Sequence, residues 1–470
     1  MPGLFGAFEI GRRALLAGQA GLSVTSQNIA NANTPGYTRK IARQISVEGA
    51  RLPEGIVGSG VDVTRIERVR DAFLDGRVLG SRAELGDARA RASFLREVEA
   101  TLDDLGDGSL TSAVGAFFDA WHDLALSPES LELRAAVRGA GSKVASLLDR
   151  QSEALSEQRR RLAESIPSDV ADVNARLGRI AELSRRIATI EAGGAAANES
   201  RDERQREVEE LSEIVEVSAA ESPTGRFLVR VGGAIVADGD HAIGVSLVRI
   251  GDDDAAGLSG GGADEGLALV AGSVTLAPRA GALAAKVDAV NAALPSILTR
   301  LDEIAEGLAE SVNALHAAGT GLDGSTGVAF FDAGEGGAGA AARIRISAAV
   351  RADAGKVAAS ADGGPGDNGT ARAIADLSRT ATLRGGTRSV GQVVSEMSEA
   401  VARETGDAAF LEEARGHFVE ALENRRDSVS GVSLDEEAAN LVAYQHAYEA
   451  AARVMSVANE MIATLLAEVR

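Results

Sequence analysis

Apolar residues recur every seven positions near both ends of the chain. In the stretch 3–33, large residues at one heptad position, Phe8, Leu15, Leu22 and Ile29, face mostly small residues at another, Leu4, Gly11, Gly18, Thr25 and Ala32. A repeat of this kind predicts a helix that packs along one seam against a partner helix. Each glycine inside a helix costs about 1 kcal/mol relative to alanine, so we expect this helix to be unstable without its partner.

A second seven-residue repeat occupies the C-terminal end. It comprises Leu441, Tyr448, Met455, Ile462 and Val469, with Tyr444, Ala451, Ala458 and Leu465 between them. The segment from Ser433 to Glu436 has the order of a capping box, in which a serine hydroxyl and a glutamate carboxylate satisfy free N–H groups at a helix start. Four cations and one acid give residues 1–40 a charge of +3, and two cations and six acids give residues 431–470 a charge of −4. We therefore expect the two ends to attract each other.

The interior of the chain is mostly helical as well. A three-four spacing of apolar residues extends from Val170 to Ile190 and again from Leu283 to Leu315. Pro295 interrupts the second run, and we expect it to kink the helix or to start a new one. Further helical patterns cover the ranges 81–105, 129–165, 199–214, 388–404 and 407–429.

Two stretches have the pattern of strands instead. Residues 38–66 contain alternating segments separated by glycine and proline, which predict a short hairpin or an extended arm. Residues 215–250 contain two apolar runs on either side of a Gly-Gly pair, and residues 267–276 have the pattern of one more strand. Together these last two segments predict a small β domain inserted between helical halves.

These patterns predict a mainly α chain with a β insertion, elongated and divided into several domains. A chain of 470 residues exceeds what one compact core usually holds. We expect a terminal coiled-coil assembly domain of residues 1–40 and 430–470, disordered in the monomer, a helical bundle domain of residues 41–214 and 280–429, and a small outer β domain of residues 215–279.

Charge and composition exclude several classes of function. The formal net charge of −21 repels nucleic-acid backbones, and the absence of cysteine excludes disulfides and thiolate metal centres. The five histidines are too dispersed for a local metal site, so we expect neither metal nor cofactor. No stretch of about 18 apolar residues occurs, and we expect no membrane insertion. Arg12 and Arg13 before a short apolar stretch imitate a twin-arginine signal, but the heptad repeat there favours a helix that is kept.

Several short motifs imitate catalytic or ligand-binding sites. The nucleophile-elbow pattern G-x-S-x-G surrounds Ser259, but its neighbours are glycine and aspartate rather than a strand and a helix. The fingerprint G-x-G-x-x-G begins at Gly319, Gly334 and Gly364, again without the strand and helix of a dinucleotide site. Asp252–Asp254 lack the ligand spacing of a calcium loop. We therefore expect a protein that is not an enzyme.

The residues that leave the first helix form a distinctive motif. The segment Asn28-Ile29-Ala30-Asn31-Ala32-Asn33-Thr34-Pro35-Gly36-Tyr37-Thr38-Arg39 suits a helix exit. Asparagine tolerates the left-handed region, Pro35 prevents further helix and Gly36 allows a positive φ. This segment resembles the N-terminal motif of bacterial flagellar axial proteins of the rod, hook and hook-associated types.

The other end of the chain carries a second resemblance to that family. Ser430-Gly431-Val432-Ser433-Leu434-Asp435-Glu436-Glu437, followed by Asn440-Leu441, Tyr444-Gln445, Ala447-Tyr448 and Asn459, is similar to its C-terminal signature. The S-G-V-x-L-D-E-E form points to the hook-associated members. Asp202-Glu203-Arg204 with Leu211-Ser212, and His316 to Gly319 followed by Phe330-Phe331, extend the resemblance through the middle of the chain.

The resemblance implies a structural protein of the bacterial flagellum. Such a protein forms the first junction layer between hook and filament and allows the filament to assemble. It is cytoplasmic before export, leaves uncleaved through the flagellar type III apparatus and ends in the extracellular flagellum. Its partners would be further copies in a helical array, the hook protein, a second hook-associated junction protein, and the export chaperone and export apparatus. The alternatives are a hook or distal-rod axial protein, or an axial protein that carries a hydrolase or adhesin insert.

The expected assembly interface combines the two seams with the helix-exit motif. It comprises Phe8, Leu15, Leu22, Ile29, Asn31, Asn33, Pro35, Gly36, Tyr37, Leu441, Tyr444, Tyr448, Met455, Ile462 and Leu465. All three tyrosines of the chain belong to this set. The scarcity of aromatic residues thus directs attention to the two ends.

Overall fold

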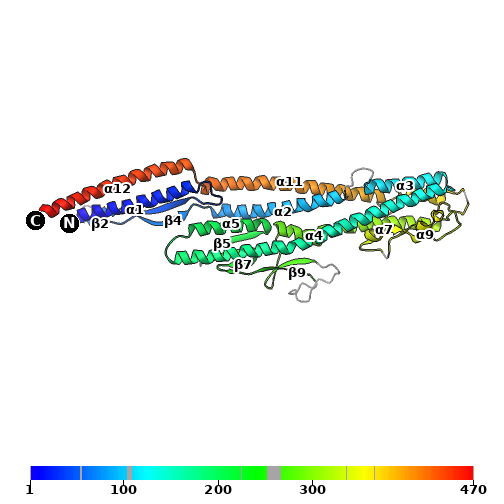
Figure 1. Cartoon of the computed structure of the whole chain (residues 1–470), viewed down its shortest axis with the longest axis horizontal. Helices are drawn as coiled ribbons and strands as arrows, with labels where there is room; N and C mark the ends of the chain where they lie inside the picture. The colour runs from blue at the N-terminus through cyan, green and yellow to red at the C-terminus, as the bar shows by residue number, and fades with distance from the viewer. Residues whose placement is uncertain are drawn as a thin grey trace.

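The computed structural model of the chain is a long rod, and both termini lie at the same end of it (Figure 1). It describes residues 2–52, 55–102, 108–223, 225–250, 266–334, 336–364 and 366–468. Long helices make up most of the rod, and small antiparallel sheets lie along it. The expectation of a mainly α chain with a β insertion is confirmed.

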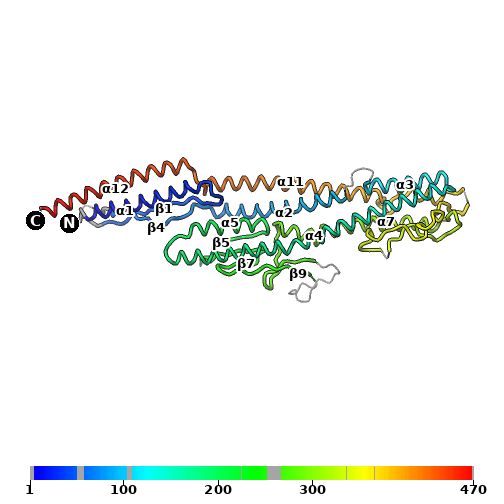
Figure 2. The backbone as a smooth tube through the Cα atoms, viewed as in Figure 1, coloured from blue at the N-terminus to red at the C-terminus, as the bar shows by residue number. Residues whose placement is uncertain are grey.

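Two antiparallel helices and a strand hairpin form the end of the rod that carries the termini (Figure 2). The helices are α1 (Pro2–Ala30) and α12 (Leu434–Glu468), and the hairpin comprises β1 (Lys40–Ser46), β2 (Ala50–Leu52), β3 (Gly55–Val57) and β4 (Val61–Arg68). β1 pairs with β4, and β2 pairs with β3. The hairpin lies against α1, where the Arg13 guanidinium binds Asp62 at 2.7 Å. We call α1, β1–β4 and α12 the terminal domain, so the hairpin falls outside the bundle to which the sequence pattern assigns it.

The rest of the rod, which we call the body, is a bundle of long helices. These are α2 (Ala72–Leu102), α3 (Leu110–Leu126), α4 (Leu131–Ala192), α5 (Asn198–Ile214), α6 (Ala282–Asp288), α7 (Leu294–Ala318) and α11 (Val390–Ser430). Two of them are longer than the sequence pattern indicates. α4 joins two predicted helices and continues through Pro167, and α11 joins the predicted helices 388–404 and 407–429.

Pro295 lies in the first turn of a new helix, α7, which is one of the two outcomes that the sequence predicts. A π-helical turn, η1 (Ala289–Ala293), joins α6 to α7 with helical backbone angles on both sides. Proline has no N–H to donate, and the wider turn shifts the hydrogen-bond pairing before it. The carbonyl of Val290 accepts a hydrogen bond from Nε of Arg159 at 2.8 Å. The helix therefore stays continuous because a neighbouring helix satisfies its backbone.

The β insertion packs on α4. It contains β5 (Val217–Glu221), β6 (Phe227–Val231), β7 (Ala234–Asp238) and β8 (His241–Ala242) in one sheet, and β9 (Val245–Arg249), β10 (Leu267–Ala271) and β11 (Val274–Leu276) in another. The predicted single strand 267–276 is two strands, because the chain turns at Gly272 with φ +59°. One apolar cluster contains residues of α4, α5 and both sheets. The insertion therefore shares its core with the body.

The far end of the rod holds the loops and short elements between α7 and α11 (Figure 1). These elements are β12 (Phe331–Asp332), α8 (Ala340–Arg343), β13 (Arg345–Ile346), α9 (Ala348–Ala352), η2 (Ala354–Lys356) and α10 (Gly369–Asp376). Their apolar side chains cover a buried aromatic group formed by Phe117, Phe118, Trp121, Phe330 and Phe331. Five of the twelve Phe and Trp side chains of the chain thus gather in this one buried group.

Candidate assembly interface and its joint to the body

The seam between α1 and α12 is built on glycine. Three glycines of α1 each face a large residue of α12: Gly11 faces Met455, Gly18 faces Tyr448 and Gly21 faces Tyr444. A Cβ atom at Gly21 would lie 2.5 Å from Cε1 of Tyr444, a distance that real side chains do not tolerate. The helices therefore approach closely only because this position has no side chain. The order of the three pairs makes the helices antiparallel.

The predicted interface residues differ in how far the single chain buries them. The small residues of the seams, Gly11, Gly18, Thr25, Ala451 and Ala458, are buried. The large residues Phe8, Leu15, Leu22, Ile29, Leu441, Tyr444, Met455 and Ile462 are half-buried, and Tyr448 and Leu465 are 40% and 39% exposed. The helix pair therefore leaves an outer apolar surface.

Charge attraction between the two helices is smaller than the sequence predicts. Arg12 and Arg13 form ion pairs within α1, and Arg13 also binds Asp62 of the hairpin. Among the described residues, Arg39 is the one of the four N-terminal cations that reaches a C-terminal acid, with its Nε 2.8 Å from Glu437. The opposite net charges of the two ends therefore meet at one point rather than along the seam.

Asn28 organises the helix-exit motif. Its Oδ1 atom accepts hydrogen bonds from the Tyr37 hydroxyl at 2.8 Å and from the Lys40 backbone N–H at 3.0 Å. Its Nδ2 atom donates to the Lys40 carbonyl at 2.9 Å, and the residue is 1% exposed. Burial raises the pKa of Tyr37, which keeps its hydroxyl protonated as a donor. Asn28 belongs to the sequence motif but not to the predicted interface residues. The place of Asn28 at the start of the motif is the signal that could have identified its role.

The other motif residues shape the turn after α1. Asn31 donates from Nδ2 to the carbonyl of Gln27 at 2.9 Å, which satisfies the end of the helix. Gly36 has a φ of +73°, and the aliphatic part of Arg206 occupies the space that a side chain there would need. Asn33 and Pro35 are exposed. Tyr37 thus lies where the terminal domain meets the body, and Asn33 and Pro35 lie on the surface.

The start of α12 is fixed by Arg39. The Arg39 backbone N–H donates to the carbonyl of Ser430 at 2.9 Å, and its guanidinium binds Glu436 and Glu437 at 2.8 Å each. The Ser433 hydroxyl accepts from the Glu436 backbone N–H at 3.4 Å, as in the predicted capping box. The Glu436 carboxylate, however, pairs with Arg39. The hydroxyl half of the box is therefore present, and the carboxylate half is replaced by an ion pair.

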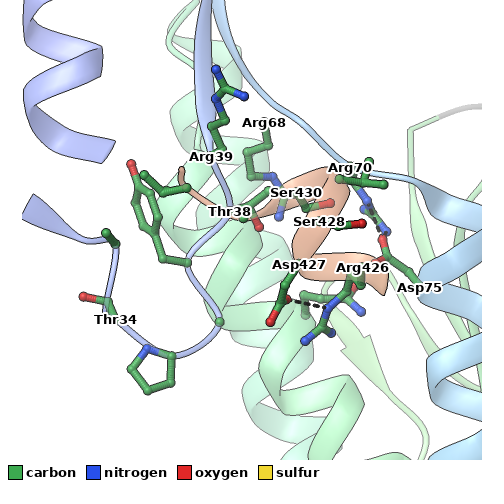
Figure 3. A pocket seen from close by; sticks show the side chains of 18 of the residues that line it. Thr34, Thr38, Arg39, Arg68, Arg70, Asp75, Arg426, Asp427, Ser428 and Ser430 are labelled. Atoms are coloured by element: carbon green, nitrogen blue, oxygen red, sulfur yellow. Dashed lines mark hydrogen bonds and ion pairs between the residues drawn. The ribbon is translucent and has the colours of Figure 1, made fainter. Parts of the chain in front are cut away.

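A crevice of about 500 Å³ lies between the terminal domain and the body (Figure 3). Five arginines line it, and four of them pair with a carboxylate: Arg39 with Glu437, Arg68 with Asp202, Arg70 with Asp75, and Arg426 with Glu209. The sequence pattern indicates none of these pairs, and in all but Arg70–Asp75 the two members are more than a hundred residues apart. Because four of its five arginines pair with carboxylates, we describe this crevice as a polar joint between the terminal domain and the body.

The motifs that imitate catalytic sites gain no support from the described residues. Ser259 and Asp252–Asp254 lie outside them. Within the described ranges, no group of three or more His, Cys, Asp or Glu side chains could hold a metal ion. Asp323 accepts from the Ser325 backbone N–H at 2.9 Å and binds Lys356 at 3.1 Å, and these contacts lower its pKa. Its carboxylate therefore stabilises its own loop.

One helical stretch has the length and composition of a membrane span, although the sequence pattern predicts none. The stretch Val390–Ala467 is long and apolar enough to cross a membrane by these criteria, and 11% of its apolar window is buried. Its alanines raise the apolar content without forming a continuous run of large residues. The window that meets these criteria is therefore mostly exposed, whereas the first turns of α11 are buried in the core of the body.

Comparison with protein families assigns the ends of the chain first. The family described as flagella basal body rod protein matches residues 8–38, and the family described as flagellar basal body rod FlgEFG protein C-terminal matches residues 425–468. These segments contain the two helices of the terminal domain. An elongated helical body with such paired terminal helices defines a flagellar axial protein.

The body identifies which axial protein family this is. The family described as flagellar hook-associated protein FlgK helical domain matches residues 95–331, which is half of the chain. The chain belongs to the family of flagellar hook-associated protein 1. Its relatives include flagellar hook-associated protein 1 of Bacillus subtilis (strain 168), 29% identical over 98% of both chains, and that of Escherichia coli (strain K12), 23% identical over 96% of this chain and 97% of the relative.

A solved structure shares the fold of the rod. The flagellar hook junction protein FlgK from Burkholderia pseudomallei matches with a TM-score of 0.64 and 13% identity, over 76% of this chain and all of that chain. Family membership makes the present chain a structural protein of the hook–filament junction, located in the extracellular flagellum.

Proposed function

We propose that the chain builds the first layer of the hook–filament junction by packing the outer faces of its α1–α12 pair against neighbouring copies in a helical array. The observation that carries this proposal is the apolar surface that the pair leaves exposed. It comprises Phe5, Leu16, Leu434, Val442, Tyr448, Val454, Val457, Met461, Leu465 and Leu466. Contiguous exposed apolar residues mark an interaction surface, and heterologous contacts between identical copies generate tubes rather than closed dimers.

The terminal helices order when they join this array. Internal glycines weaken α1, and the partner helix leaves part of each large side chain of the seam exposed. A helix whose apolar face is incompletely covered gains most of its stability from tertiary packing. The neighbouring copies supply the packing that a single chain lacks.

The further partners that we propose rest on the family to which the chain belongs. The assembled layer contacts the hook protein on one side and a second hook-associated junction protein on the other. Before export the chain is cytoplasmic, is held by the export chaperone and passes unfolded through the flagellar export apparatus with its N-terminus uncleaved. The β insertion faces outward. We assign the chain no catalytic role and no membrane insertion, since the apolar stretch of its last two helices serves subunit contacts.

The variant Tyr448→Asp tests the assembly surface. Tyr448 faces Gly18 and is 40% exposed, so a carboxylate there places a charge in the contact between copies. We expect secretion of the variant at the normal level and loss of filament growth beyond the hook. The measurements are immunoblots of the culture medium, soft-agar swimming and immunogold labelling, which should mark one short band between hook and filament in the parent strain.

The control for this variant is His446→Asp. His446 is exposed on the same helix and lies outside the heptad seam, so an aspartate at this position adds the same negative charge without entering the seam. We expect normal swimming from this control. Normal swimming by Tyr448→Asp, or equal loss with both variants, contradicts the assignment of the surface.

Limited proteolysis tests the order-on-assembly step. In the purified monomer we expect rapid cleavage within about 40 residues of each end, because frayed termini are preferred cleavage sites. The body, with its buried aromatic core, should remain as a resistant fragment. Resistance of both ends in the monomer shows that the terminal helices are already folded and overturns this step.

A further inference from the structure

The joint between the terminal domain and the body is polar. The three apolar clusters of the described residues contain members of the body and the β insertion, and none from the terminal domain. The chain crosses the joint twice, at residues 69–71 and 431–433. Apart from these two chain connections, hydrogen bonds and ion pairs must therefore hold the terminal domain to the body.

The N-terminal end of α5 supplies several of these contacts, beside the hydrogen bond from the Arg39 backbone to Ser430 of α11. Asn198 donates from Nδ2 to the carbonyl of Ile66 at 2.9 Å. Asp202 binds Arg68 at 2.7 Å, and the two side chains are 8% and 6% exposed. The backbone N–H of Thr38 also points to Asp202, at 3.4 Å. A body helix thus presents two side chains to three positions of the terminal domain.

A second ion pair lies beside the first. Glu199 of α5 binds Nζ of Lys40, whose side chain is 1% exposed. The same ammonium group lies 5.1 Å from the centre of the Tyr37 ring and 3.5 Å from Oε1 of Gln27. A buried ammonium is costly unless it is paired, so Glu199 stabilises the helix-exit motif from outside the terminal domain.

The remainder of α5 is fixed to the body. Val208 and Leu211 are fully buried in the cluster that α5 shares with α4 and the sheets. The Arg204 guanidinium lies 3.7 Å from the centre of the Phe227 ring and binds Glu221 at 3.0 Å. Because this part of α5 cannot leave the body without exposing apolar residues, any movement at the joint moves the terminal domain.

We propose that Asn198, Glu199 and Asp202 form a latch that sets the direction of the terminal domain and can open while both parts stay folded. Opening exposes polar groups and no apolar core, and the crevice of about 500 Å³ beside the latch gives the domain room to turn. A buried ion pair favours two discrete states, because a half-broken pair leaves an uncompensated charge. The purpose of the latch is to let neighbouring copies meet in one orientation. In this purpose alone, the latch rests on the proposed function.

Paired spin labels measure the latch directly, since the chain has no cysteine that would take an unwanted label. Thr64→Cys on β4 and Glu182→Cys on α4 are exposed sites in the terminal domain and in the body. The distance distribution between their labels reports the joint. β4 carries Ile66 and Arg68 and lies outside the terminal helices that are expected to order on assembly, so this pair reads the latch whether or not α1 and α12 are folded.

The latch predicts a narrow distribution in the full-length parent chain. Asp202→Asn and Arg68→Met should each broaden it about twofold, because each leaves one buried charge unpaired. Combining the two substitutions should restore part of the narrow component. Glu203→Gln is the matched control, since Glu203 is the exposed neighbour of Asp202 and should leave the width unchanged. Parental width in both single variants overturns the latch.

Two further readings separate this result from misfolding and from failure of the proposed function. Fluorescence of Trp121, the one tryptophan, must stay that of a buried ring in every variant, and the milder Glu199→Gln replaces any variant whose body unfolds. A second label pair, Gln19→Cys with Glu449→Cys, reports α1 against α12. If the Gln19 and Glu449 pair gives a narrow distribution in the monomer, order on assembly is contradicted and the latch is not. If the Thr64 and Glu182 pair keeps its parental width in the Asp202→Asn and Arg68→Met variants, the latch is contradicted and order on assembly is not.

Discussion

At the scale of single residues, His316 shows how the core of the body depends on one protonation state. The Ala358 backbone N–H donates to Nε2 at 3.0 Å, so the proton of the neutral ring is on Nδ1, which donates to the Val328 carbonyl at 2.6 Å. The ring also packs edge-on against Trp121 and Phe330. Burial lowers the pKa of His316 to about 4. The imidazole is therefore neutral at pH 7, and a second proton would break the bond from Ala358.

This pKa predicts a loss of stability in mild acid. The folded-state pKa lies below the ordinary value of 6.5, so the contribution is complete above pH 6.5 and is lost as the pH falls toward 4. Between pH 7 and pH 5 the parent chain should lose about 2 kcal/mol of unfolding free energy that His316→Asn does not lose. Urea unfolding followed by Trp121 fluorescence measures the difference, because the two rings lie 6.1 Å apart. His417→Asn, at an exposed position, should behave as the parent, and equal losses in the parent and His316→Asn would refute the assignment.

Single residues also attach the short strands, and here the sequence offers no signal. The Asn174 amide exchanges two hydrogen bonds with the backbone of Val245, at 2.8 and 2.7 Å. The Asn291 amide does the same with Leu267, at 2.7 and 2.8 Å. An asparagine supplies both a donor and an acceptor and so completes the backbone pairing of a strand edge. Each asparagine is an isolated polar residue in a helix, and periodicity cannot show which strand lies opposite.

At the scale of elements, the heptad repeats predict α1 and α12 and the small-against-large character of their seam. They do not predict that Gly21, outside the seven-residue series of Gly11 and Gly18, makes the closest approach. That detail depends on the rotation of each helix about its axis, which the final antiparallel packing decides. The length of α4 escapes prediction for a related reason, since Pro167 reads as a break until its neighbours are in place.

The glycine seam leads to a prediction with a control in the same helix. Gly21→Ala puts a methyl group against the Tyr444 ring and should weaken the pair by about 1 to 3 kcal/mol through overpacking. Gly6→Ala meets no atom within 4 Å and should stabilise the helix by about 1 kcal/mol. We expect reduced soft-agar swimming with normal secretion for Gly21→Ala, and parental swimming for Gly6→Ala. The seam described above is wrong if Gly21→Ala swims as well as Gly6→Ala.

At the scale of the whole molecule, the β insertion and the body form one structure. The chain leaves and re-enters the rod at adjacent points, because a Cβ at Gly281 would lie 2.6 Å from Cα of Val215. The sheets nevertheless cover an apolar stripe of α4 that comprises Val170, Val173, Leu177 and Ile180. The chain connections of the insertion would therefore allow its excision, but its apolar packing makes it part of the core of the body.

Excision of residues 217–279 and closure with two glycines tests which property dominates. Uncovering a buried valine, leucine or isoleucine costs about 1.5 to 3 kcal/mol each, so we expect a lower melting temperature of the helical signal in circular dichroism. The control Ile235→Ser with Ile243→Ser alters two exposed residues of the insertion, one in β7 and one after β8, and leaves the apolar stripe of α4 unchanged. An excised chain that melts at the parental temperature would mean that the body folds without the insertion.

The sequence patterns miss α3 and the continuation of α4 and α11, but they predict the other long helices, the position of the β insertion and the two terminal motifs. These features are local, since heptad spacing, capping residues and turn residues act within a few positions of one another. Tertiary structure alone decided that Arg68 meets Asp202, that Lys40 meets Glu199 and that the hairpin lies on α1. Partners separated by more than a hundred residues leave no periodic trace in the sequence. Their pairing follows from how the helices stack, and the joint that orients the assembly surface is built from such pairs.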